Sequence, residues 1–237
     1  MKSRKWTVAF LLCIPLFFHE ARADVLLYDT GTTSSDYSNA GAVVGYNGTS
    51  QFSRGQSFTN NQGAIAISSI KVWLSVLADS PTVSGTFKLS LFSSTGTPGS
   101  NALPLNQLAT TGPINAAGLG LTNTAQLISF DNLNWALDGS ASNYFFVFDA
   151  QNMTGPSTNY FIWQNSVPAV AGQNAAYSTN FSTWSHTSVT GAAQVYGVVP
   201  EPGTWLMMSL GLSMAGSCFG FRAIRRRARP VAVSPGR

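Results

Sequence analysis

The middle of this 237-residue chain, residues 24–199, predicts an all-β domain. Several short segments alternate apolar and polar residues, which is typical of strands with one buried face. Stretches rich in glycine, serine, threonine and asparagine separate these segments, and no part of 24–199 keeps a helical period. Eight or nine strands divided by polar turns favour a β-sandwich with jelly-roll-like connections.

Two segments show the alternation most clearly. The even positions of Ile70–Val76 are aliphatic, and the odd positions of Phe87–Leu91 are apolar in the same way. A loop signal at Asp79–Gly85 separates them, so we expect them to pair as antiparallel neighbours. The run Asn143–Asp149 is apolar on both faces, which predicts a central strand of a two-layer structure. Further strands are predicted at Val25–Tyr28, Gly55–Thr59, Gln126–Phe130, Tyr160–Gln164 and Gln194–Val198, with a weaker one at Ala175–Tyr177.

Proline and glycine residues indicate where the domain has a long connection and where it ends. They interrupt Thr97–Leu121 repeatedly, and we interpret that stretch as a long connection with one short strand near Gln107–Thr110. The domain is predicted to end near Val199, where alternation gives way to proline.

The N-terminus has the three parts of a secretory signal peptide. A basic start is followed by the apolar run Trp6–Phe18 and by the cleavage motif Ala21-Arg22-Ala23. Residues 1–23 are therefore predicted to engage the Sec translocon and to be removed by signal peptidase after Ala23. The alternative is an uncleaved anchor, which the short apolar run and Pro15 disfavour.

The C-terminus also has three parts. The motif Pro200-Glu201-Pro202-Gly203 precedes an uncharged run, 204–221, which is followed by an arginine cluster at 222–229. As a helix the run measures about 27 Å, just enough for a hydrocarbon core of roughly 30 Å. Positive segments stay in the cytoplasm, so the cluster and the tail 230–237 are predicted to lie there, with the domain on the other side of the inner membrane.

This arrangement resembles the PEP-CTERM sorting signal, with Pro200-Glu201-Pro202 as its motif. The resemblance implies processing near Pro200–Gly203 by a membrane transpeptidase, exosortase. It also implies an inner-membrane precursor whose mature form reaches the cell surface or extracellular matrix of a Gram-negative bacterium. An ordinary C-terminal anchor is the alternative.

Within the domain, four segments resemble the choice-of-anchor R group over roughly residues 50–165. They are Arg54–Thr59, Ile67–Val72, Leu89–Ser100 and Tyr144–Val147. The resemblance implies no established enzymatic activity. The last segment departs from the pattern, because it lacks the tryptophan expected there.

Charge in this chain is divided between the ends and the middle. The net charge is +4, yet 24–199 holds only Arg54, Lys71 and Lys88 against seven aspartates. Nucleic-acid binding needs a basic patch, and the domain has none, so the sequence excludes a nucleic-acid role. Both cysteines, Cys13 and Cys218, lie outside 24–199, so the domain is expected to depend on its core alone.

Few residues of the domain carry reactive chemistry. His186 is its one histidine, no G-x-S-x-G elbow is present, and no glutamate precedes Glu201 within it. We therefore expect no catalytic residues and no enzyme activity. No zinc site is expected. Calcium remains open at the oxygen-rich segment Asp29–Asn39, where Asx turns explain the same residues.

Aromatic side chains are the remaining candidates for ligand binding. Trp184 lies in a Ser/Thr-rich loop and is expected to be exposed, Trp73 faces away from Val72 and Leu74, and Tyr177 is the third candidate. Such rings stack on sugars when exposed and form core when buried. The sequence predicts a non-enzymatic surface or matrix protein associated with the envelope, an exopolysaccharide or a biofilm. The alternative is a carbohydrate-binding module that uses exposed aromatics.

Overall fold

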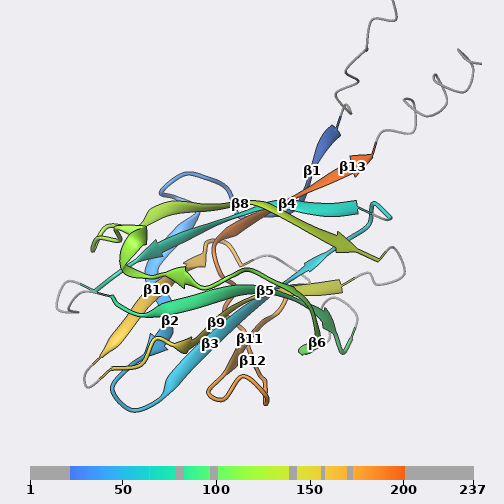
Figure 1. The fold of residues 1–237 in the computed structure, drawn as a ribbon. Helices are drawn as coiled ribbons and strands as arrows, with labels where there is room; N and C mark the ends of the chain where they lie inside the picture. Colours follow the sequence, from blue (N-terminus) through green and yellow to red (C-terminus); the bar gives the residue numbers. More distant parts are fainter. Residues whose placement is uncertain are drawn as a thin grey trace, which may run out of the picture. The chain divides into compact units, whose positions relative to one another are not determined.

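The computed structural model describes residues 22–63, 65–77, 83–96, 101–138, 143–155, 158–169 and 173–200. Within these ranges the chain forms strands and one short 3-10 helix, which confirms the all-β prediction (Figure 1). Residues Ala23–Val199 form one compact unit, and the contacts below lie within it. The predicted signal-peptide core and the predicted span 204–221 lie outside the described residues.

Thirteen strands and the 3-10 helix η1 follow one another along the chain. They are β1 (Arg22–Asp29), β2 (Tyr37–Tyr46), β3 (Gln51–Thr59), β4 (Ile65–Ser75), β5 (Thr86–Ser94), β6 (Pro104–Thr110), β7 (Ile114–Asn115), η1 (Ala117–Leu119), β8 (Gln126–Leu137), β9 (Asn143–Asn152), β10 (Asn159–Ser166), β11 (Ala175–Ser178), β12 (Ser185–Thr187) and β13 (Ala193–Pro200).

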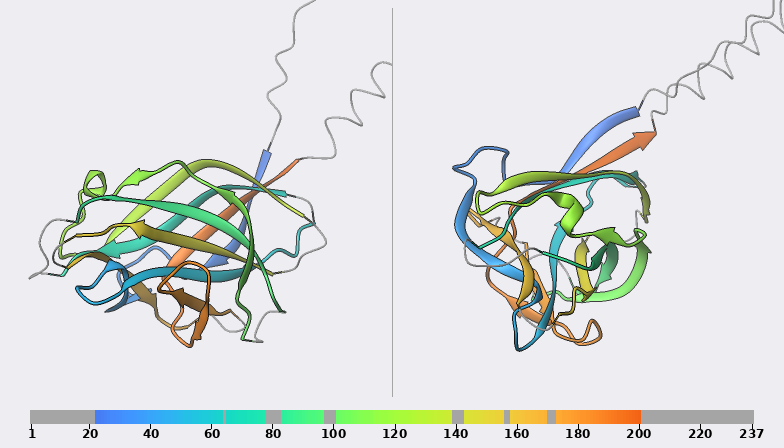
Figure 2. Two further views of the ribbon diagram at one scale, coloured as in Figure 1. Left: turned by 60° about the horizontal axis from the view of Figure 1, so that its bottom comes forward. Right: turned by 60° about the vertical axis from the view of Figure 1, so that its left-hand side comes forward.

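These strands are hydrogen-bonded into one antiparallel sheet. Its main path runs β1-β13-β4-β10-β2-β3-β9-β5-β6, with β8 on the free edge of β4, β7 on β5, and the β11–β12 hairpin on β3. The sheet bends, so that β4 and β8 face β5 and β9 (Figures 1 and 2). Hydrogen bonding stays continuous through the β2–β3 pair, and the jelly-roll-like sandwich stays a prediction.

Aromatic rings fill the space between the two halves of the bent sheet. Phe87 on β5 lies 6.1 Å from Phe130 on β8, measured between ring centroids. Phe148 on β9 lies 5.6 Å from Phe161 and 5.1 Å from Trp163, both on β10. Edge-to-face contacts of this kind add to the burial of apolar area, so the main core lies on the inner face.

Strand β9 is buried on both faces, as its sequence predicts. Tyr144, Phe146 and Phe148 belong to the main core. Phe145 and Val147 point to the opposite side, where they form a second cluster beneath the β11–β12 hairpin. The strand lies between β3 and β5, so the prediction of a central strand is confirmed.

The predicted number of strands and one predicted pairing are wrong. The sequence predicts eight or nine strands, whereas the described residues form thirteen. Ile70–Val76 and Phe87–Leu91 do not pair, because β8, β13 and β10 occupy the edges of β4 while β9, β6 and β7 occupy those of β5. Strand β2 was not predicted at all. Its glycines suggest a loop, yet a Cβ at Gly41 would lie 2.6 Å from the Trp163 carbonyl oxygen, so glycine permits close pairing with β10.

Candidate functional site

One pocket of the domain lies beside β3, where two strands divide one edge of the sheet between them. One edge of β3 pairs with β2 only at Gln51 and Phe52, and then with β11 from Ser53 to Gln56. Strands β2 and β11 therefore pair with successive parts of this edge. A pocket of about 190 Å³ lies in the resulting gap.

Small residues create most of the pocket space. Its lining comprises Gly41, Ala42, Gly55, Ala175, Ala176 and Gly191, together with Arg54, Trp163, Asn165, Thr187 and Val189. Six of these eleven residues are glycine or alanine, so backbone rather than bulky side chains forms much of the wall. The larger residues supply one cation, an amide, a hydroxyl and an indole.

Arg54 crosses from β3 to β2 beside this gap. Its Nε donates a hydrogen bond to the Val43 carbonyl oxygen at 3.0 Å. The guanidinium carbon lies 5.2 Å from the Phe52 ring centroid and 5.1 Å from that of Tyr177, so both rings interact with the cation. Burial lowers the pKa of the Arg54 guanidinium, and no carboxylate among the described residues offsets this.

Hydrogen bonds fix the part of the pocket wall around Gly191 and Trp163. The Gly191 N–H donates to the side-chain oxygen of buried Gln56 at 2.8 Å, and the Gly191 carbonyl accepts from the Tyr28 hydroxyl at 2.9 Å. The Trp163 indole N–H donates to the Ala192 carbonyl oxygen at 3.1 Å. Burial raises the pKa of the Tyr28 hydroxyl, which keeps it protonated as a donor. This wall is thus rigidly placed.

The three predicted ligand-binding aromatics do not come together. Tyr177 stands against Arg54 at the pocket. Trp184 is half-buried rather than exposed, because its ring packs 6.0 Å from Phe92 and 5.7 Å from Phe181. Trp73 faces away from Val72 and Leu74, as predicted, and its ring lies 4.6 Å from that of Tyr37. Their role in binding stays a prediction.

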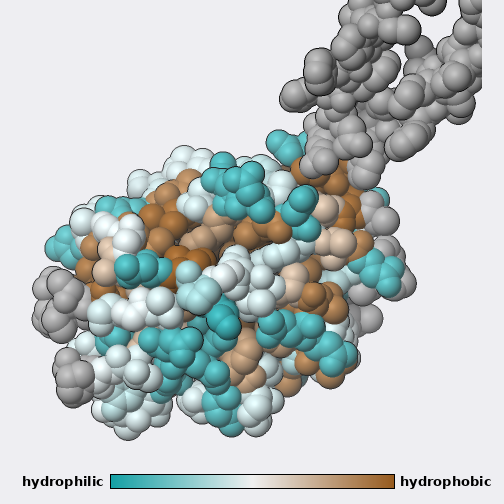
Figure 3. All heavy atoms as spheres, in the orientation of Figure 1, coloured by the Kyte–Doolittle hydropathy of each residue, from teal (hydrophilic) through white to brown (hydrophobic). Residues whose placement is uncertain are grey.

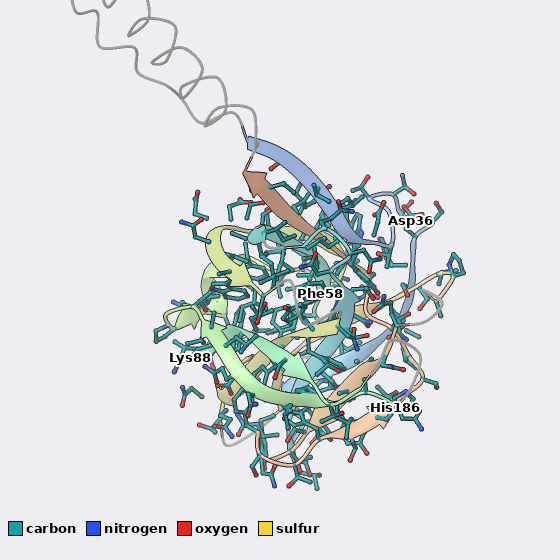
Figure 4. All side chains as sticks on the ribbon, turned by 90° about the vertical axis from the view of Figure 1, so that its right-hand side faces the viewer. Asp36, Phe58, Lys88 and His186 are labelled. Atoms are coloured by element: carbon teal, nitrogen blue, oxygen red, sulfur yellow. The ribbon has the colours of Figure 1, made fainter. Side chains whose placement is uncertain are left out.

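His186 and Asp36, which the sequence analysis considered for catalysis and for calcium, do not lie together. Figure 4 shows Asp36, Lys88 and His186 around the periphery, with Phe58 in the interior. His186 is exposed, and its Nε2 lies 3.3 Å from the Asn174 side-chain oxygen. Asp36 accepts hydrogen bonds from the Thr33 N–H and hydroxyl, which lower the pKa of its carboxyl. Within the described ranges, no three His, Cys, Asp or Glu side chains are grouped to hold a metal.

Sequence reasoning missed Arg54 as a site residue, although a signal was present. Alternation along β3 places Arg54 on the same face as Gln56 and Phe58. Phe58 belongs to the main core. A cation on a buried face, in a domain with only three cations, is the signal that points to this position.

In the comparison with protein families, one segment of the chain matches a known family. Residues 198–227 match the PEP-CTERM protein-sorting motif. Comparisons with curated proteins and with solved structures gave no match. Among the described residues no helix has the length and apolar character to cross a membrane. The sorting motif supports a PEP-CTERM protein, for which exosortase is the processing partner, export the route and a membrane-anchored precursor the starting form.

Proposed function

We propose that this chain is the precursor of a non-enzymatic protein of the cell surface or extracellular matrix of a Gram-negative bacterium, associated with its envelope or exopolysaccharide. The observation that supports this most is the sorting motif at residues 198–227. The signal-peptide pattern at residues 1–23 supports the same route, because such a segment directs the chain to the Sec translocon.

The tail is suited to removal after export. By sequence preference, a proline disfavours a helical conformation of the residue before it, and Glu201 stands directly before Pro202. The arginine cluster that follows the apolar run holds the other end in the cytoplasm while cutting occurs. On this proposal the tail directs sorting, and the mature protein does not retain it.

The domain suits a hydrated, non-catalytic role. It carries only Arg54, Lys71 and Lys88 as cations, and its face in Figure 3 shows hydrophilic and apolar residues interspersed. We also propose that the bent sheet has the architecture of a jelly-roll-like β-sandwich. Contacts across its interior, such as Phe87 with Phe130, support this.

The second candidate function is carbohydrate binding. The pocket beside Tyr177 favours it, because an aromatic ring, a cation, an amide and a hydroxyl meet in one concave space. Sites for small ligands are typically concave and mostly apolar, with a few placed polar groups.

Processing is tested with a Glu201→Ala variant expressed in the native host. The expected result is an uncut chain in the inner-membrane fraction, whereas the wild type appears in the outer envelope or medium. The matched control is Glu20→Ala, which removes the other glutamate from a segment expected to be discarded. Release of the Glu201→Ala protein at the wild-type rate would contradict the proposal.

A further inference from the structure

The gap beside β3 has room for a group about the size of one sugar ring. Its volume is about 190 Å³. A water molecule takes up roughly 30 Å³ in the liquid, so the pocket has room for on the order of six waters. This is smaller than typical drug-sized pockets of about 300 Å³ or more, which excludes an oligosaccharide lying fully inside.

Arg54 leaves most of its hydrogen-bonding capacity unused. A guanidinium has five N–H donors, and here Nε satisfies one on the Val43 carbonyl oxygen. The two terminal nitrogens, Nη1 and Nη2, have no hydrogen-bond partner among the described residues. The Phe52 and Tyr177 rings hold the cation in place without using these donors. A half-buried fork of free donors matches a carboxylate, which accepts two parallel bonds.

The charge of the site favours a monoanion. Lys71 stacks over the Tyr196 ring, with its Nζ 4.9 Å from the ring centroid. Lys88 lies on β5, and neither lysine lines the pocket. One guanidinium without a second cation balances a single negative charge, whereas a phosphate at neutral pH carries nearly two.

The other lining groups suit a hydroxylated ring. Thr187 supplies a hydroxyl and Asn165 an amide, while Trp163 and Val189 supply apolar surface. Such a wall recognises a ring that has C–H faces and hydroxyl edges. A simple carboxylate such as acetate leaves most of this wall without contact.

From this arrangement we propose that the pocket binds one hexuronate residue, with its carboxylate on Arg54. The inference rests on the proposed function only for the source of the ligand, which is the chain end of an acidic polysaccharide or the free acid. The shared chemistry is a carboxylate attached to a hydroxylated six-membered ring. An internal residue of a polymer does not enter, because the pocket accommodates a single ring.

Calorimetric titration of the full chain in detergent tests this. The probes are glucuronate and galacturonate, with glucose and galactose as matched neutral sugars and acetate and inorganic phosphate as free anions. We expect at least one uronate to bind at least about tenfold more tightly than its neutral counterpart, because a charge-assisted bidentate pair is lost in the latter. A short oligouronide binding like the monomer identifies the chain end as a source, and binding of the monomer alone identifies the free acid.

Three variants assign the effect to the pocket. Arg54→Gln and Arg54→Lys should each weaken uronate binding by about tenfold or more, because neither retains the fork of donors. Lys88→Gln removes a cation away from the pocket and should leave binding unchanged. Ala42→Leu fills the pocket, leaves Arg54 in place and should abolish binding. Thermal unfolding of each variant establishes that it is folded.

Several outcomes overturn the inference. They are no uronate binding by the wild-type chain, equal binding of the neutral sugars, tighter binding of phosphate, or full uronate affinity in folded Arg54→Gln. If Arg54→Gln does not fold, full affinity in Ala42→Leu overturns it instead. These results are independent of tail processing, so the ligand inference and the proposed sorting fail separately.

Discussion

The two edges of β3 differ in how completely they are paired. On one edge, six consecutive residues from Arg54 to Thr59 pair with β9 without interruption. On the other edge, β2 and β11 each pair with a part of β3, and a pocket lies between them. A continuous ladder lets side chains pack tightly, whereas two strands that share an edge leave a gap. We therefore expect the β9 edge to contribute more to stability and the β2–β11 edge to be available for binding.

The largest expected effect is in the β9 region. Phe148→Ala removes a fully buried ring that packs against Phe87, Phe161 and Trp163. We expect a loss of about 3–5 kcal/mol in the free energy of unfolding, measured by urea denaturation. Phe52→Ala, at a half-buried ring on the open edge, is the matched control and should cost clearly less. Similar losses in the two variants would contradict the comparison.

Gly191→Ala tests whether the pocket wall is rigid. A Cβ at Gly191 would lie 2.2 Å from the Trp163 ring, which is buried and hydrogen-bonded to Ala192. Because a shift of this ring would disturb its hydrogen bond to the Ala192 carbonyl oxygen, we expect a loss of about 1–3 kcal/mol. Gly112→Ala is the control, since its Cβ would meet no atom within 4 Å. A neutral Gly191→Ala variant would show that the wall adapts.

Trp184→Ala probes the cover over the outer face of β9. The ring is half-buried against Phe92 and Phe181, so its removal should cost roughly 1–2 kcal/mol and leave the chain folded. Circular dichroism and urea denaturation measure both quantities. Unfolding of the variant would place Trp184 in the main core, and an unchanged stability would mean that the cover adds nothing.

The smallest expected effect on stability is at Asp149, near the C-terminal end of β9. Burial raises the pKa of its carboxyl, against weaker opposing effects of the Gln151 N–H and Lys88. A raised pKa stabilises the fold fully below the unfolded value of about 3.9, and this contribution is lost as pH rises through the folded value. Asp149→Asn, which can still accept from the Gln151 N–H, should therefore be slightly more stable than the wild type at pH 7.

The same variant should match the wild type near pH 3, where both side chains are neutral. Thermal melts at the two pH values measure the difference. Asp24→Asn, at an exposed carboxylate, serves as the control. A variant that is less stable than the wild type at pH 7 would contradict this assignment.

Local pattern predicted some elements of this fold and missed others for identifiable reasons. Strand β9 was predictable because every position of its core is apolar, whichever strands it pairs with. The partner of β4 was not, because an alternating segment carries no record of its neighbours. Strand β2 was hidden by Gly41 and Gly45, which serve close strand approach here rather than a loop.

The candidate site shows the same limit. Tyr177 was predictable as an aromatic candidate, but its contact with Arg54 depends on the register between β11 and β3. Trp184 lies in a polar loop, yet Phe92, distant in the chain, half-buries it. The sorting motif was recognisable directly, because its function depends on a short contiguous sequence.

Intact-mass analysis of the mature protein from its native host tests most directly whether the tail is a removable sorting signal. We expect a chain that begins at Asp24 and ends near Pro200 to Gly203, with any covalent addition at that end. Peptides covering Trp205 to Arg222 recovered as the dominant form, in cells that possess the sorting enzyme, would contradict it.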